Sequence, residues 1–235
     1  RLDLTVIVNN AVYDSDDFVQ ELNVVTLNLS GLNAGEYNVK ALFSTGASTL
    51  ILNTTAFNVS KADSSIVIDV ENVYYVGDEV VITLTPSFDG IVTVLINDES
   101  YVLEDDYTIT IEDAVYGNYN IEATLAGDDN HNESIAYSDF EVIKYPTELI
   151  IGDIYTDDEL YTIIPISIDH VSDLTVSGTV TVTIISGEII VDEFTSDNFV
   201  GDEIEVNAGV LEPGDYTFVV TYNGNENDDT SFDSN

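Results

Sequence analysis

The sequence predicts an all-β protein built as a linear array of β-sandwich domains. Two observations carry this prediction. Apolar residues, most of them β-branched or aromatic, alternate with polar ones in short runs, and no stretch has the period of a helix. One motif also recurs three times, as GEYNVKALFSTG (35–46), GNYNIEATLAGD (117–128) and GDYTFVVTYNGN (214–225). A recurrence at this scale is typical of repeated domains.

The tyrosines of the three motifs, Tyr37, Tyr119 and Tyr216, are 82 and 97 residues apart. These spacings match the length of one immunoglobulin-like sandwich. Alternation after Tyr37 places Val39 and Ala41 on the same face as the tyrosine. A Gly-x-Tyr at the start of such a strand resembles the tyrosine corner of immunoglobulin-like domains. Three recurrences in the same local context favour a corner over a buried tyrosine of no special role.

Further repeats supply the other strands. Alternating segments precede each corner: LTVIVNN (4–10), IVTVLIN (91–97) and TVTVTII (179–185). Closing strands run into linkers at TAFNVSKAD (55–63) and SDFEVIKYP (138–146), with Lys61 and Lys144 at matching positions. Opening strands follow at 64–70 and 147–154, and second strands at 78–86 and 158–167.

This order of strands predicts three immunoglobulin-like domains. We expect a domain over residues 1–62 that lacks its two opening strands, a complete domain over 63–144, and a domain over 145–235 that lacks its closing strand. Ragged ends of this kind suggest a segment of a longer linear assembly. The missing strands would come from the same polypeptide or from a neighbouring copy that donates a strand; the third alternative is that nothing fills these positions because the ends are disordered.

The charge balance excludes two classes of partner. Of the 235 residues 45 are acidic and four are basic, and the formal net charge is −41. The four cations, Arg1, Lys40, Lys61 and Lys144, cannot form a basic patch. Binding to nucleic acid or to an anionic membrane surface is therefore not expected. There is no cysteine, which fits a cytosolic protein and a disulfide-free surface protein equally well. No apolar run approaches 20 residues, so no membrane insertion is expected.

Three segments resemble a known family: LNLSGLNAGEYNVKALFS (27–44), YYVGDEVVITLTP (74–86) and AGDDNHNES (126–134). They are similar to the bacterial and archaeal immunoglobulin-like domains arrayed in large adhesin-like surface proteins, especially those of methanogenic archaea. The last segment resembles the family's Gly-Asp-x-Asn-Tyr-x-x-Ser loop, with His131 in place of tyrosine. The third repeat departs most, at YNGNENDDTSF (222–232). The resemblance implies extracellular display at the cell surface, spacing or adhesion, and no catalysis.

No residue is predicted to be catalytic, and the protein is not expected to be an enzyme. His131 and His170 are the only histidines, and neither lies in an arrangement that supports a nucleophile. We expect both to be solvated loop side chains. Carboxylates are so abundant that a pair of them carries no information about glycoside hydrolysis.

Two loops are candidate calcium sites, and no other cofactor is expected. Oxygen-bearing side chains alternate along them as at the start of an EF-hand loop. The candidate ligands are Asp128, Asn130 and Asn132 in the second repeat and Asn223, Asn225, Asn227 and Asp229 in the third. Against this, Glu133 stands at the sixth position where an EF-hand has glycine. Asn and Asp also gather in turns simply because they tolerate turn geometry. Both interpretations stay open.

Four glycosylation sequons occur, at Asn28, Asn53, Asn58 and Asn132. Asn28 and Asn58 each lie between two apolar residues of an alternating segment and should therefore face solvent. A sequence rich in Asn and Thr also produces sequons by chance. If the chain is extracellular, we expect at least one of the four to carry sugar.

Two functions remain. The first is a structural array, such as a stalk, fibre or surface-layer filament, in which the partners are neighbouring copies or further immunoglobulin-like repeats of the same protein. The second is an adhesin module that recognises a glycan or protein on a cell surface through the loops at the ends of a sandwich.

Overall fold

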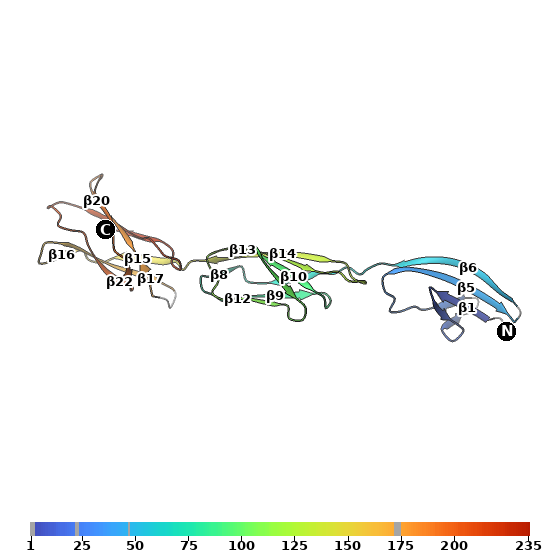
Figure 1. Cartoon of the computed structure of the whole chain (residues 1–235). Coiled ribbons are helices and arrows are strands. Elements are labelled where there is room, and N and C mark those ends of the chain that lie inside the picture. The colour runs from blue at the N-terminus through green and yellow to red at the C-terminus, as the bar shows by residue number, and fades with distance from the viewer. Residues whose placement is uncertain (1–2, 22–23, 47, 172–174) are drawn as a thin grey trace. The chain divides into compact units, whose positions relative to one another are not determined.

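The computed structural model describes residues 3–21, 24–46, 48–171 and 175–235. All of its regular elements are strands, β1 to β24, and most pair antiparallel. The prediction of an all-β array of immunoglobulin-like sandwiches is confirmed (Figure 1). In the part of the chain that the structure describes, no helix is long and apolar enough to span a membrane.

The sheets fall into three groups along the chain, within residues 3–59, 66–143 and 147–234. We call these groups the first, middle and third repeats. By Cα proximity the chain divides instead into two compact units, whose boundary runs through the middle repeat. One unit holds residues up to 69 with 84–107 and 121–137, and the other holds 70–83, 108–120 and 138–235.

The middle repeat has two sheets. One has five strands in the order β11 (Glu99–Leu103), β10 (Val92–Ile96), β13 (Gly117–Leu125), β14 (Ser134–Ile143) and β8 (Val73–Tyr75). The other has the order β12 (Thr108–Ile111), β9 (Val80–Pro86) and β7 (Ile66–Asp69). Every second residue of β9 and β10 is buried, as expected of strands with one face on a core.

The third repeat has the same plan. One sheet has the order β20 (Ile189–Thr195), β19 (Val180–Ser186), β23 (Thr217–Tyr222) and β24 (Ser231–Ser234). In the other, β17 (Thr162–His170) pairs with β15 (Thr147–Ile151), β16 (Tyr155–Thr156) and β22 (Glu203–Asn207). A small ladder joins β18 (Ser177–Gly178) to β21 (Phe199–Val200).

One expectation about the third repeat is wrong. No closing strand was expected after its Asn- and Asp-rich loop, but β24 pairs antiparallel with β23, with Phe232 opposite Thr221. The strand has four residues where β14 has ten. Four residues are too few to show the alternation of apolar and polar residues by which a strand is predicted.

The first repeat has one four-stranded sheet in the order β2 (Ala11–Tyr13), β1 (Asp3–Val8), β5 (Gly35–Thr45) and β6 (Ser48–Val59). Its remaining strands, β3 (Phe18–Glu21) and β4 (Val24–Leu27), pair with each other. By position before the corner, β4 corresponds to β12, which pairs with β9 in the middle repeat. No strand of the described residues 3–59 takes the place of β9.

The three corner strands, β5, β13 and β23, pair in the same register with their sheet neighbours β1, β10 and β19. Ala41 of β5 lies opposite Val6, Ala123 of β13 opposite Val94, and Val220 of β23 opposite Val182. The hairpin turn that follows each of these neighbouring strands contains one residue with positive φ: Asn9 (50°), Asn97 (49°) and Gly187 (64°). Asn and Gly are the residues that adopt this conformation most readily.

Candidate functional site

The three corner tyrosines make the same hydrogen bond. Each hydroxyl donates to the backbone oxygen four residues upstream: Tyr37 to Asn33 at 2.8 Å, Tyr119 to Val115 at 3.1 Å, and Tyr216 to Glu212 at 2.9 Å. A hydroxyl bonded back to the backbone before its strand is the geometry of a tyrosine corner. All three residues are half-buried rather than fully buried.

The rings differ in what they pack against. Tyr37 stacks on Phe57 of β6 with ring centroids 5.3 Å apart, and Tyr119 stacks on Phe140 of β14 at 4.6 Å. Tyr216 has a tilted contact with Phe218 at 6.5 Å. The difference follows from the short β24: its aromatic residue, Phe232, lies opposite Thr221, and its pairing with β23 ends at Val219, before Tyr216.

The loop after the middle corner strand is held by Asp128. Its Oδ1 accepts from the backbone N–H groups of Asn130 and His131, both at 2.7 Å. The His131 ring adds a contact from Nδ1 at 2.9 Å and stacks on Phe88. These bonds lower the pKa of Asp128, with the His131 ring contributing most and the backbone N–H groups adding to it.

The loop of the third repeat has the same turn, 97 residues later. Oδ1 of Asn225 accepts from the N–H groups of Asn227 and Asp228, both at 2.7 Å. A glycine precedes the turn in each loop, Gly127 and Gly224. A Cβ at either would lie 2.8 to 2.9 Å from backbone atoms of its own loop. The two loops are therefore one structural element, which we call the Asx loop (residues 127–132 and 224–229).

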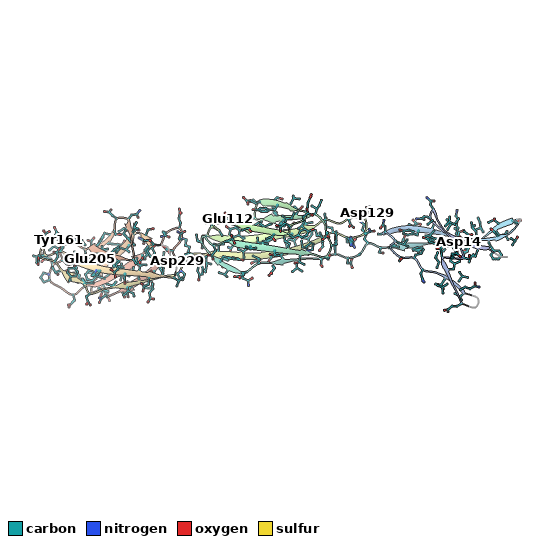
Figure 2. All side chains as sticks on the ribbon, turned by 90° about the horizontal axis from the view of Figure 1, so that it is seen from below. Asp14, Glu112, Asp129, Tyr161, Glu205 and Asp229 are labelled. Atoms are coloured by element: carbon teal, nitrogen blue, oxygen red, sulfur yellow. The ribbon has the colours of Figure 1, made fainter. Side chains whose placement is uncertain are left out.

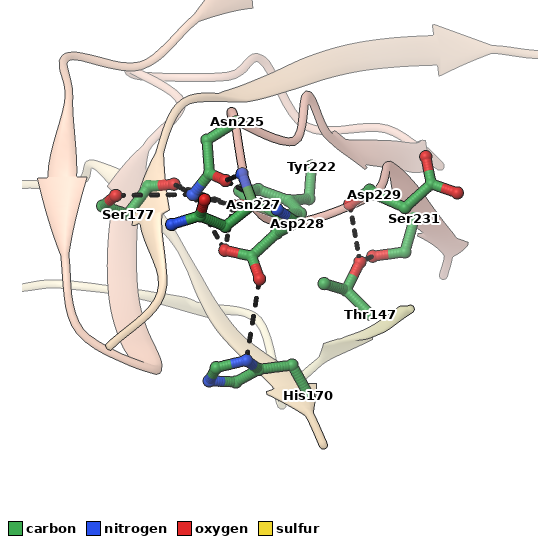
Figure 3. Close-up of polar contacts among 9 residues, drawn as sticks. All are labelled: Thr147, His170, Ser177, Tyr222, Asn225, Asn227, Asp228, Asp229 and Ser231. Atoms are coloured by element: carbon green, nitrogen blue, oxygen red, sulfur yellow. Dashed lines mark hydrogen bonds and ion pairs between the residues drawn. The ribbon is translucent and has the colours of Figure 1, made fainter. Parts of the chain in front are cut away.

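A buried polar cluster lies beneath the second Asx loop (Figure 3). Asp228 is 2% exposed. Its Oδ2 accepts from Asn225 Nδ2 at 2.8 Å, and its Oδ1 lies 3.6 Å from Nδ1 of His170, whose side chain is also buried. The Tyr222 hydroxyl donates to the backbone oxygen of Ser177 at 2.7 Å. Burial, aided by the Asp228 charge, raises the pKa of Tyr222 above its usual range.

The expectation that both histidines are solvated loop residues is wrong for His170. It ends β17 and pairs with Asp228 in the interior. Asp228 stands where His131 stands in the middle repeat. Sequence reasoning missed the pair because an aspartate inside a run of Asn and Asp looks solvated.

Several of the candidate calcium ligands make hydrogen bonds within the protein. Asp128 and Asn225 direct Oδ1 at backbone N–H groups, and Asn132 donates its amide to Asp63 Oδ1 at 3.1 Å. Asn223 donates to Thr179 Oγ1 and Thr181 Oγ1. Among the described residues, no group of three or more His, Cys, Asp or Glu side chains could hold a metal. Such groups do not include asparagine, which supplies most of the candidate ligands, so calcium binding stays an untested prediction.

The four sequon asparagines are exposed. Asn28 follows β4, and Asn53 and Asn58 lie on β6. Asn132 differs because its amide nitrogen, the atom that a sugar would modify, is hydrogen-bonded to Asp63.

The surface is acidic in all three repeats. Figure 2 labels Asp14, Glu112, Asp129, Glu205 and Asp229, all exposed. A shallow depression of about 540 Å³ lies over β15, β17 and β22. Its lining includes Gly152, Pro165, Glu203 and Glu205, and the exposed Tyr155 donates its hydroxyl to Glu205 Oε1 at 3.0 Å. The depression lies on a sheet face rather than among the end loops where a ligand site was expected.

Comparison with known proteins adds little to this description. No family model matches the chain, and no curated protein matches it. Among solved structures, titin domains A168–A170 match at 12% identity with a TM-score of 0.34, over 99% of this chain and 87% of that one. The FN1–FN3 domains of chicken CNTN1 match at 13% identity with a TM-score of 0.27, over 100% of this chain and 87% of that one.

Proposed function

We propose that the chain is a non-catalytic structural segment of an extracellular, cell-surface array, in which immunoglobulin-like repeats act as spacers of a stalk, fibre or surface layer. Three repeats with the same corner and the same register support a modular, repeat-by-repeat construction. The high negative charge supports a well-solvated surface that resists lateral clumping.

One observation carries the proposal. Val94 and Ala123, which face each other in the middle repeat, are both 0% exposed, and so are Val182 and Val220 in the third. The equivalent pair of the first repeat, Val6 and Ala41, is only half-buried. Of the apolar side chains described in residues 3–62, only Val8 belongs to the buried core. In the third repeat Val182 and Val220 belong to one buried cluster with residues of the β22–β17–β15 sheet, and the middle repeat has a second sheet as well, β12–β9–β7.

The half-buried face of the first repeat is therefore covered by a strand that is equivalent to β9 and comes from a neighbouring immunoglobulin-like repeat. Such a strand alternates apolar and polar residues, as β9 does, and would pair with β4 as β9 pairs with β12. Pairing of backbone groups together with alternate side chains set into a groove is how an added strand binds a sheet edge.

A peptide with the sequence of residues 78–90 tests this idea on the full chain. It is expected to bind and to slow amide exchange in β1 and β5, while a peptide of the same composition with its alternation scrambled does not. Absence of binding, or binding that leaves β1 and β5 unaffected, would overturn the proposal. Molar mass measured against concentration identifies the donor: growth above 25.7 kDa indicates a second copy.

The array would be glycosylated. At least one of the four sequons is expected to carry sugar in native material: Asn28, Asn53 and Asn58 are exposed, while Asn132 is expected to be less occupied because Asp63 accepts from its amide. Mass spectrometry of native peptides measures all four sites. Four unmodified sites would refute glycosylation.

A second candidate function is a binding module for a glycan or protein ligand. The depression beside Tyr155 and Glu205 favours it. An exposed aromatic ring can stack on one face of a sugar while a neighbouring carboxylate accepts hydrogen bonds from the sugar hydroxyls. A glycan array probed with the full chain and with Glu205→Gln separates the two functions. Binding that Glu205→Gln abolishes would favour the module over the spacer.

A further inference from the structure

The two linkers contact the Asx loops in the same way. Ala62, in the linker after the first repeat, donates its N–H to the Asn130 oxygen at 2.7 Å and accepts from the Asn132 N–H at 2.9 Å. After the middle repeat, Tyr145 donates to the Asn227 oxygen at 2.8 Å and accepts from the Asp229 N–H at 2.9 Å. Each linker thus adds one parallel bridge to a loop that lies in the next repeat.

Side chains on both sides of this bridge repeat as well. The ammonium of Lys61 donates to the Asp128 backbone oxygen at 2.5 Å, and that of Lys144 donates to the Asn225 backbone oxygen. Three residues after each lysine a hydroxyl donates to the other end of the loop. Ser64 bonds the Asn132 oxygen, and Thr147 bonds the Asp229 oxygen at 2.9 Å.

Four contacts therefore match, donor for donor and acceptor for acceptor. The side chains at the positions in between differ. Ala62 and Tyr145 make these contacts through their backbone alone. The two loops have Gly, then Asp or Asn, and later Asn at equivalent positions, and different residues elsewhere. A coincidence of packing would not reproduce the same polar contacts on different side chains. In a chain with a net charge of −41, two of four cations lie at these contacts.

We propose that each Asx loop is a docking site for a Lys-x-x-Ser/Thr segment, and that this segment is the joint by which one repeat is attached to the next. The lysine binds the loop oxygen nearest the turn, the bridge residue pairs with the loop backbone, and the hydroxyl closes the far end. The turn made by Asp128 or Asn225 directs these backbone oxygens toward the linker and thereby forms the receptor.

The docking contact lies within the chain itself and is independent of what covers the first repeat. It makes part of the linker belong to the following repeat. The last residues of one domain then stabilise the loop of the next, which couples neighbouring repeats energetically.

Amide exchange on the full chain tests the joint. Lys144→Met keeps the length of the side chain and removes the ammonium. It is expected to speed exchange of the Tyr145 and Asp229 amides about tenfold, the effect of losing one charged hydrogen bond. The Ala62 and Asn132 amides should not change. Lys61→Met is expected to speed exchange of the Ala62 and Asn132 amides and to leave those of Tyr145 and Asp229 unchanged. Its effect should be smaller because the Lys61 contact is more exposed.

Lys40→Met is the matched control, since Lys40 is an exposed lysine on β5 outside both joints. It should alter neither pair of amides. Thr147→Val removes the far contact and is expected to speed exchange at Asp229 more than at Tyr145. The proposal is overturned if Lys144→Met leaves Tyr145 and Asp229 unchanged. It is also overturned if all three lysine variants alter both loops equally, which would show a general effect of charge.

Discussion

Nδ1 of His131 lies 2.9 Å from Oδ1 of Asp128, the same oxygen that accepts the two backbone N–H groups of the loop. Three donors thus meet one carboxylate oxygen, and they favour its charged form. In the third repeat Asn225 makes the same turn without a charge. Two versions of one loop, one ionisable and one not, therefore occur in the same chain.

The first prediction concerns acid. Because the pKa of folded Asp128 is below 3.8, its unfolded value, its contribution to stability is present above pH 3.8 and is lost as the pH falls through the folded value. Exchange of the Asn130 and His131 amides should accelerate in that window. Asp128→Asn, which copies Asn225, should remove the dependence and keep the turn. An unchanged acid response in this variant would contradict the assignment.

The second prediction concerns alkali. The pKa of Tyr222 is raised above its unfolded value of 10, so its contribution is complete below pH 10 and is lost as the pH rises further. Thermal unfolding of the third repeat should therefore occur at lower temperature above pH 10. Tyr222→Phe is expected to flatten this slope and to cost about 1 to 2 kcal/mol at neutral pH, through its lost hydrogen bond. An equally steep slope in the variant would show that another group is responsible.

The third prediction concerns the buried pair. Nδ1 of His170 lies 3.6 Å from Oδ1 of Asp228 and both side chains are buried, and a buried polar group left without a partner costs about 1 to 3 kcal/mol. His170→Leu is expected to destabilise the third repeat by about 1 to 3 kcal/mol, and the double variant with Asp228→Asn by less than the sum of the two single changes. Urea unfolding of the four proteins of this cycle measures the coupling. Additive effects would mean that the two side chains do not interact.

The fourth prediction concerns the corners. Tyr119→Phe keeps the stack on Phe140 and loses the hydroxyl bond, for a cost of about 1 kcal/mol. Tyr119→Ala also loses the stack and should cost about 2 to 3 kcal/mol, less than a fully buried aromatic would. Tyr216→Ala should cost less than Tyr119→Ala, since Tyr216 has no stacked partner. Denaturant unfolding of each variant gives the comparison, and a reversed order would contradict it.

The fifth prediction concerns calcium. Oδ1 of Asp128 and of Asn225 is already directed at backbone N–H groups, so a metal would have to displace those bonds. Calcium is therefore expected to leave the melting temperature of either repeat unchanged. Calorimetry with calcium and then with a chelator measures this, and a calcium-dependent rise would support the EF-hand-like interpretation instead.

Much of the fold could be predicted because period and recurrence survive in the sequence. The corners at Tyr37, Tyr119 and Tyr216 and the strands before them follow from three similar motifs. β24 could not be predicted, since four residues carry too little alternation. The joint could be predicted only in part. Lys61 and Lys144 stand at matching positions, but their acceptors are backbone oxygens, which no residue type marks. The pair of His170 and Asp228 left no local signal, because its members lie 58 residues apart.

The middle repeat carries both halves of the joint, with a receptor loop after its corner strand and a lysine segment at its end. Duplication of such a module inserts a domain that fits the one before it and the one after it without any further substitution. The two halves also differ in kind, so the modules can be joined in one order only. A chain lengthened in this way keeps a single direction from its first module to its last, and its length can change in evolution while its connections stay the same.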